Sequence, residues 1–189
     1  MASMETLSAP GWRKRFLTLS ELPGAYLRAA LWLPRYLWVH LARRFPAADR
    51  ERWQLALTEV NDCRHCRWIH SGFLAVVTKK GESGLPDDDP GMILARAFGE
   101  KDGLADEEWL DAVSRAFGKN SRDFRSLMEV MHTANCSGNA IDAGLLALRG
   151  IRHEQTGAPA AVLVMCIVFL FGLLPACLGW AAHRVAKRG

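Results

Sequence analysis

The stretch from Arg50 to His70 reads RERWQLALTEVNDCRHCRWIH. Its first eleven residues contain neither glycine nor proline, and they predict a helix that ends near Val60. Asn61 and Asp62 are residue types typical of turns and helix N-caps, so a second helix is expected to begin there. Cys63, Cys66 and His70 would then share one face of that helix, because residues three and four positions apart are neighbours on a helix surface.

This arrangement suits a reactive thiol. The positive end of the helix dipole favours a thiolate in the first turn, and an imidazole one turn later can accept or donate a proton. Glu51 and Glu59 are the nearby carboxylates, and a turn at Asn61 would let the preceding helix fold back and bring one of them to the thiols. The stretch therefore predicts a paired-cysteine redox centre, without indicating which glutamate serves it.

The chain around this stretch also predicts helices. Segments with helical composition or amphipathic spacing are expected at Asp62–Lys79, Gly91–Gly99, Asp106–Phe117, Ser121–His132 and Asn135–Leu148, with Gly150 as a stop signal. The run GESGLPDDDP at Gly81–Pro90 is a loop by composition. No segment alternates with a period of two over the length of a strand, so the expected fold class is all-α.

The C-terminal part contains a long uncharged stretch. Ala158 to Ala182 is 25 residues without a charge, enough to cross a hydrocarbon core of about 30 Å as a helix. Trp180 near its end and the basic residues that follow it are typical of a membrane boundary. We expect a single-pass C-terminal transmembrane helix, and hence membrane lipid as a partner.

Three parts are expected along the chain. Residues 1–45 form a basic, aromatic N-terminal arm, in which Ala25–Leu41 is either an interfacial amphipathic helix or a helix packed on the domain or on a neighbouring subunit. Residues 46–152 form the helical domain, and residues 153–189 hold the connector, the anchor and a basic tail. Met1 to Arg15 has no apolar core of signal-peptide type, so the domain is expected to lie in the cytoplasm.

Composition excludes other classes. A net charge of +4 is too small to indicate nucleic-acid binding. The five cysteines are too few and too unevenly placed for a secreted disulfide framework, and a close cysteine pair in a reducing compartment is more often catalytic or metal-binding.

The motif resembles one known family. Glu51, then eleven residues, then Cys63-x-His65-Cys66-x-x-x-His70 is similar to the pattern of AhpD-like alkylhydroperoxidases in the carboxymuconolactone decarboxylase superfamily. Ser137 to Asp142 resembles the closing helix of that family. The likeness covers roughly residues 37–152, and the C-terminal anchor and the N-terminal arm depart from the usual soluble members.

The resemblance implies a thiol-dependent peroxidase that reduces alkyl hydroperoxides. Cys66 would attack the peroxide, Cys63 would close a disulfide with it, and Glu51, His70 and His65 would relay protons. A lipoyl group or a thioredoxin-like protein would reduce the disulfide, and neither cofactor nor metal is expected. The family also implies assembly as trimers or larger rings.

Alternatives remain open at this stage. Cys63, His65, Cys66 and His70 include zinc-ligand types, although a structural site usually draws on a second, distant pair. Cys136 is more often an inert core cysteine, and Asp87 to Asp89 are more often a solvated helix start than a cation site. The alternative to a peroxidase is a non-catalytic or accessory subunit of a larger membrane complex, since a fold does not establish an activity.

Overall fold

The computed structural model describes residues 15–78, 88–149 and 162–167, and this part of the chain is helical without a strand. The all-α expectation is therefore confirmed for the described residues. The elements are α1 (Leu22–Leu41), α2 (Ala47–Val60), α3 (Arg64–Val77), α4 (Pro90–Glu100), α5 (Glu107–Phe117), a 3₁₀ turn (Gly118–Asn120) and α6 (Ser121–Leu148).

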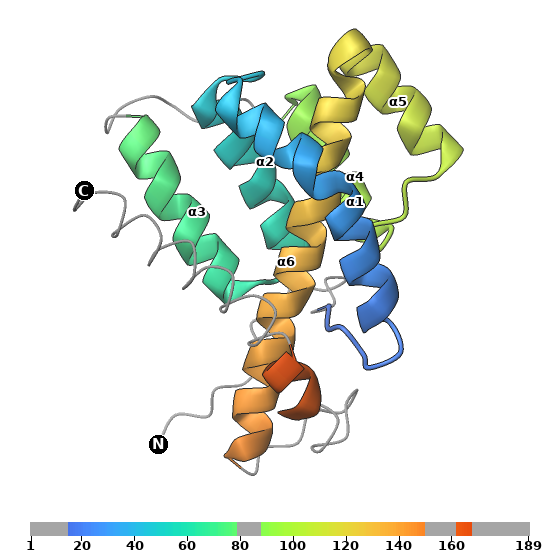
Figure 1. Ribbon diagram of the computed structural model, residues 1–189. Helices are drawn as coiled ribbons and strands as arrows, with labels where there is room; N and C mark the ends of the chain where they lie inside the picture. The colour runs from blue at the N-terminus through green and yellow to red at the C-terminus, as the bar shows by residue number, and fades with distance from the viewer. Residues whose placement is uncertain (1–14, 79–87, 150–161, 168–189) are drawn as a thin grey trace, which may run out of the picture.

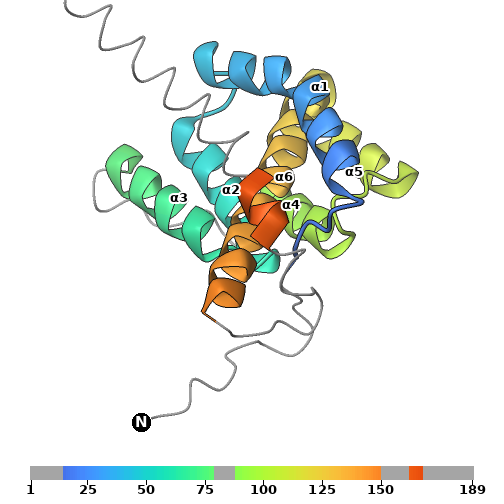
Figure 2. The same ribbon diagram turned by 60° about the horizontal axis from the view of Figure 1, so that its bottom comes forward.

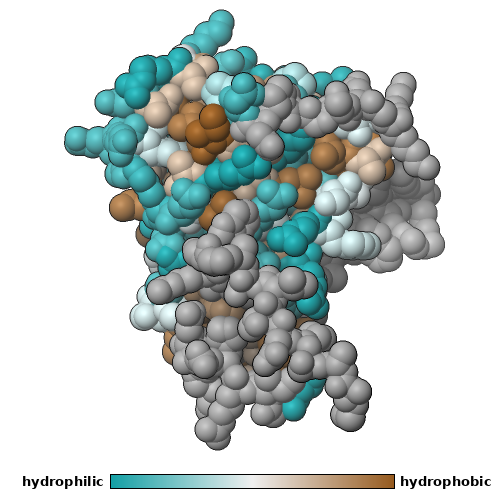
Figure 3. Space-filling view, turned by 180° about the vertical axis from the view of Figure 1, so that it is seen from behind, coloured by the Kyte–Doolittle hydropathy of each residue, from teal (hydrophilic) through white to brown (hydrophobic). Residues whose placement is uncertain are grey.

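Helix α6 is the axis of the fold. It is 28 residues long and packs against α1, α2, α3, α4 and α5. In Figures 1 and 2, α1 crosses α6, so that its first half lies on the side of α6 away from α3 and its end lies toward the start of α2, while α2 lies between α6 and α3. Seen from behind, the described surface is mostly hydrophilic, with apolar side chains in separate patches (Figure 3). The long helix thus joins every other element to one core.

Aromatic side chains fill that core. Phe117 stacks on Phe124 with ring centroids 4.3 Å apart, and Trp53 meets Phe124 edge-on at 5.3 Å. The polar ring atoms in this cluster are satisfied, because the Trp53 indole donates to Asp89 at 2.8 Å and the Trp109 indole donates to the Leu94 carbonyl at 2.9 Å. Aromatic pairs of this kind contribute about 0.5–1.5 kcal/mol each beyond their burial.

Aspartate caps set the starts of two helices. The Asp89 carboxylate accepts from the Met92 backbone N–H at 3.0 Å, and Asp106 accepts from the Trp109 N–H at 2.9 Å. Such caps stabilise a helix by about 1 kcal/mol each. Asp89, the last residue of the Asp87–Asp89 run, is therefore the N-cap of α4, as expected from the sequence for a helix start rather than a cation site.

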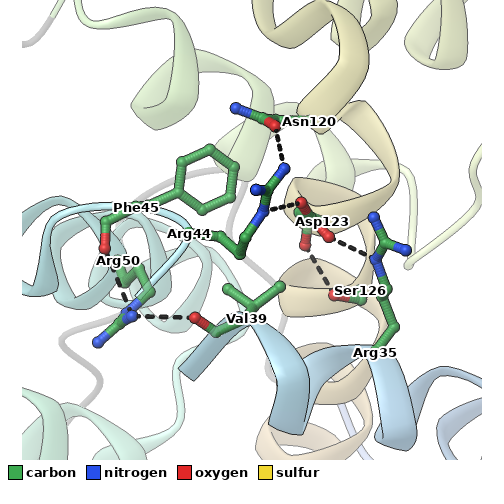
Figure 4. A network of polar contacts seen from close by, with 8 residues as sticks. All are labelled: Arg35, Val39, Arg44, Phe45, Arg50, Asn120, Asp123 and Ser126. Carbon is green, nitrogen blue, oxygen red and sulfur yellow. Dashed lines mark hydrogen bonds and ion pairs between the residues drawn. The ribbon is translucent and has the colours of Figure 1, made fainter. Parts of the chain in front are cut away.

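A buried carboxylate ties the end of α1 to the start of α6 (Figure 4). Asp123 is fully buried and pairs with the Nε atoms of Arg35 and Arg44, the latter at 3.0 Å. Arg44 also donates to Asn120, and the Arg50 guanidinium donates to the Val39 carbonyl at 3.2 Å. These contacts hold one face of α1 against α6. Of the two expectations for Ala25–Leu41, a helix packed on the domain is therefore the one that fits this face.

One detail of the predicted helices is corrected. Ser121–His132 and Asn135–Leu148 are not separate helices, because α6 runs unbroken from Ser121 to Leu148, with Asn135 and Asn139 buried in it beside polar partners. Helix α1 continues through Pro34, which lies inside it.

Several expectations fall outside the described residues. They include the N-terminal residues 1–14, most of the 81–90 loop and nearly all of the 158–182 segment, of which the structure describes residues 162–167. Within the described ranges, no helix has both the length and the apolar character needed to cross a membrane. Val164 is buried in a small apolar cluster with Leu22, Ala25 and Cys136.

Substitution of Asp123 tests the α1–α6 tie. Asp123→Asn removes the anion between two arginines while keeping the shape of the side chain. We expect it to lower the free energy of unfolding in urea by about 1–3 kcal/mol. The matched change Asp111→Asn, at an exposed position of α5, is expected to have an effect within about 0.5 kcal/mol. Equal free energies of unfolding for the two variants would contradict a structural role for the Asp123 ion pairs.

Candidate functional site

The thiol pair sits on the corner between α2 and α3. Asn61 ends α2, Asp62 takes a left-handed φ of 48°, and Cys63 is the N-cap of α3. The Cys63 sulfur accepts from the Cys66 backbone N–H at 3.4 Å, in the place usually taken by a serine or aspartate oxygen. The second helix therefore begins at Arg64, one residue later than it would with Asp62 as its N-cap. The residue that caps it, Cys63, is itself one of the two thiols.

The two thiols face each other within the protein. Their sulfur atoms lie 2.8 Å apart, and the Cys66 sulfur lies 3.9 Å from the Ala134 carbonyl on α6. Cys63 is fully buried, whereas Cys66 keeps an exposed fraction of 9%. The hydrogen bond with Cys63, followed by burial, raises the pKa of the Cys66 thiol, so these two effects outweigh the helix N-terminus on which the sequence argument relied.

One histidine–carboxylate pair is buried beside the thiols. The Nδ1 atom of His70 lies 2.7 Å from Glu51 Oε2, and both side chains are about nine-tenths buried. His70 follows Cys66 by one helical turn on α3, and Glu51 reaches it from α2. Of the two glutamates that the sequence left open, the structure brings Glu51 to the histidine, whereas Glu59 lies near Arg96.

A second histidine–carboxylate pair lies at the surface. The Nε2 atom of His65 is 2.7 Å from Asp142 Oδ1, and the His65 side chain is half-exposed. This contact joins α3 to the C-terminal half of α6. The two pairs therefore flank the Cys63–Cys66 turn, one inside the protein and one at its edge.

Polar groups behind the corner hold its backbone. The Asn139 side-chain amide donates to the Asn61 carbonyl at 2.7 Å, and the Asn61 amide lies 3.3 Å from His132 Nδ1. His132 Nε2 in turn lies 3.6 Å from the Cys136 sulfur. Burial lowers the pKa of His132 to about 4, so the ring is neutral at pH 7.

Cys136 is buried in α6 behind the corner, where its sulfur lies 3.6 Å from His132 Nε2. Burial raises the pKa of Cys136 to about 12. Its packing with Leu22 and Ala25 agrees with the core role favoured from the sequence.

Gly138 lets the corner sit on α6. A Cβ atom built there would lie 2.8 Å from the Cys63 sulfur and 3.6 Å from that of Cys66. The absence of a side chain at this position therefore allows the close approach of the thiols to the helix.

Of the five predicted site residues, the structure brings Cys63 to Cys66 at the corner and Glu51 to His70 one helical turn further along α3, while His65 meets Asp142. Sequence reasoning missed Asp142 and Gly138, although both were quoted in the closing-helix segment. Their spacing of four residues, which places them on one face of α6, was the available signal. Among the described residues, no three His, Cys, Asp or Glu side chains are grouped so that they could hold a metal ion.

Comparisons of this chain with protein-family models, curated proteins and solved structures found no match. The likeness to the AhpD-like family therefore rests on the spacing of the site residues.

A pair of glycine substitutions tests the fit on α6. Gly138→Ala should lower the free energy of unfolding by about 1–3 kcal/mol, because the new methyl group overlaps the Cys63 sulfur. Gly72→Ala, on α3 with nothing within 4 Å of the added atom, should stabilise by up to about 1 kcal/mol. Urea unfolding measures both. A Gly138→Ala protein as stable as Gly72→Ala would mean that the corner does not approach α6 as described.

The buried His132 predicts an acid-sensitive stability. In the unfolded chain its pKa is near 6.5, so between pH 6.5 and about 4 the unfolded state binds more protons than the folded state. The free energy of unfolding should therefore fall as the pH is lowered through this window, by at most about 1.4 kcal/mol per pH unit from this residue. Urea unfolding of wild type and His132→Gln, at several pH values from 7 to 4, isolates this contribution. Parallel curves would rule it out.

Proposed function

We propose that this chain is an AhpD-like, thiol-dependent peroxidase that reduces alkyl hydroperoxides through Cys63 and Cys66 at a membrane. The observation that carries the proposal is a pair of thiols with sulfurs 2.8 Å apart, on a helix whose His70, one turn after Cys66, is joined to the buried Glu51 at 2.7 Å. The matching spacing in the sequence supports it, as does the all-α fold of the described residues.

Unequal burial supports different roles for the two thiols. Cys66 keeps some solvent exposure and Cys63 keeps none, so a peroxide reaches Cys66 first. The Cys66 thiolate attacks one peroxide oxygen, the O–O bond breaks, and the departing oxygen takes a proton to leave as an alcohol. Cys66 is now a sulfenic acid, Cys63 attacks its sulfur, and water leaves as the disulfide forms.

The raised pKa of Cys66 means that a base must remove its proton. In the proposed reaction, His70 donates its Nδ1–H to Glu51, which leaves Nε2 as the acceptor for that proton. The same imidazolium returns the proton to the departing oxygen. His65, held by Asp142 at the edge of the site, is the exposed donor to the sulfenic oxygen that leaves as water.

A dithiol of the lipoyl or thioredoxin-like class completes the cycle. It attacks the Cys63–Cys66 disulfide, passes through a mixed disulfide and leaves oxidised, with both protein thiols restored. Ile69, Phe73 and Val76 follow Cys66 on the same side of α3 and are each at least 43% exposed. This apolar surface suits the approach of a lipoyl arm, an alkyl hydroperoxide or a second copy in a trimer.

Cysteine variants test the proposed chemistry. On peroxide treatment of the detergent-extracted full chain, we expect wild type to form a Cys63–Cys66 disulfide. Cys63→Ser should stop at a Cys66 sulfenic acid, because no resolving thiol is present, and Cys66→Ser should lose the reaction. Mass-spectrometric mapping with a sulfenic-acid trap reads all three products.

Cys136→Ser is the matched control, since this buried thiol has a pKa near 12 and should not alter the products. Equal peroxide reactivity of Cys66→Ser and wild type would refute the choice of nucleophile. An unreactive wild-type pair, together with normal assembly of the Cys63→Ser/Cys66→Ser protein with membrane partners, would instead support the accessory-subunit alternative.

A further inference from the structure

Helix α1 carries an apolar stripe that no described residue covers. Leu27, Leu31, Trp38 and Leu41 have exposed fractions of 63, 71, 55 and 81%. Their spacings of four, seven and three residues bring them to one side of a helix with 3.6 residues per turn. We use the term "α1 stripe" for these four residues.

The opposite side of the same helix is fixed within the protein. Leu22, Ala25 and Val39 are buried, and Arg35 pairs with the buried Asp123. The α1 stripe therefore cannot turn inward without breaking that ion pair. An exposed row of large apolar side chains of this kind marks a surface that a partner or a membrane covers.

The charge on α1 matches an anionic surface. Arg28 in the helix and Arg43 just after its end are exposed and the helix contains no acidic residue, whereas Arg35 and Arg44 pair with Asp123. Arginines beside an apolar face that contains a tryptophan are typical of helices that lie in the plane of a lipid interface. Two arginines within twenty residues also make a spanning role for α1 costly.

The C-terminal segment reaches the same end of α1. Residues 162–167 pack beside its first turn, where Val164 is buried with Leu22 and Ala25. Ile167 lines an apolar cavity of about 310 Å³ with Leu19, Leu22, Pro23 and Tyr26. Pro23 precedes Leu27 by one helical turn, so the apolar surface continues from Val164 and Ile167 onto the α1 stripe.

We propose that the α1 stripe lies on the surface of an anionic lipid bilayer, with α1 parallel to the membrane plane. The proposal rests on the membrane location given under the proposed function, and it is independent of the thiol chemistry. It commits to lipid as the occupant because basic charge, a tryptophan and a neighbouring apolar segment occur together.

Tryptophan quenching tests this placement in the full chain. The protein is reconstituted into phosphatidylglycerol-containing vesicles with brominated acyl chains, which quench nearby indoles. We expect Trp38→Phe to remove part of the quenched emission. Trp68→Phe is the matched control, because Trp68 is 79% exposed but lies on α3, and it should remove only unquenched emission.

A second test compares a charged variant within the α1 stripe with one outside it. Leu31→Glu should reduce quenching of Trp38, since a carboxylate in the stripe is repelled by anionic lipid, while Leu104→Glu, at an exposed site outside α1, should leave it unchanged. Both positions are exposed, so folding is preserved and circular dichroism confirms it.

An unquenched Trp38 overturns the proposal, and recovery of protein with the vesicles then shows whether the membrane location has failed as well. Loss of oligomer mass in Leu31→Glu with an unquenched Trp38 would assign the stripe to a contact between copies of the chain. Peroxide reactivity measured on the same samples reports separately on the thiol chemistry.

Discussion

The contact between the Cys63 sulfur and the bare backbone at Gly138 is the constraint on which the site depends. It sets how closely the α2–α3 corner approaches α6, and the Asn139–Asn61 hydrogen bond fixes the backbone of that corner behind it. Helix α6 thereby becomes the rear wall of the site. The Ala134 carbonyl, Gly138 and Asp142 recur every four residues along one face of it, opposite the N-terminal half of α3.

The same approach explains why two histidines with similar partners differ in burial. Close packing of α2 on α3 buries the Glu51–His70 pair, and a buried charge-assisted bond keeps both its geometry and its strength. The His65–Asp142 pair spans the edge of α3 and α6, where solvent weakens it. The hydrogen bond with Cys63, followed by burial, raises the pKa of the Cys66 thiol. The proposed reaction therefore requires a base held in a fixed position, and the inner pair meets that requirement better than the outer one.

The parts that sequence reasoning predicted are local in the chain. Glu51 to His70 spans two helices and one turn, and spacing within helices determines which of these residues meet. Asp142 and Gly138 were missed because they come from more than seventy residues away. The predicted break between His132 and Asn135 is absent, because α6 runs unbroken from Ser121 to Leu148. Asn135, Gly138 and Asn139 have low helix propensity, but the asparagine side chains and the smallness of Gly138 serve packing against α2 and α3, and this tertiary gain outweighs the local preference.

The position of α1 connects the two proposals. Helix α1 crosses α6, and its first half, which carries Leu27 and Leu31, lies on the side of α6 away from α3 (Figures 1 and 2). A bilayer against this part of the α1 stripe leaves α3, and with it Cys66 and the half-exposed His65, across α6 from the lipid surface. A dithiol donor in the aqueous phase then has access to the disulfide while the protein stays on the membrane. Docking by α3 instead would place the thiols against lipid and close that route, so the Asp123 ion pairs that orient α1 also decide which partner can reach the thiols.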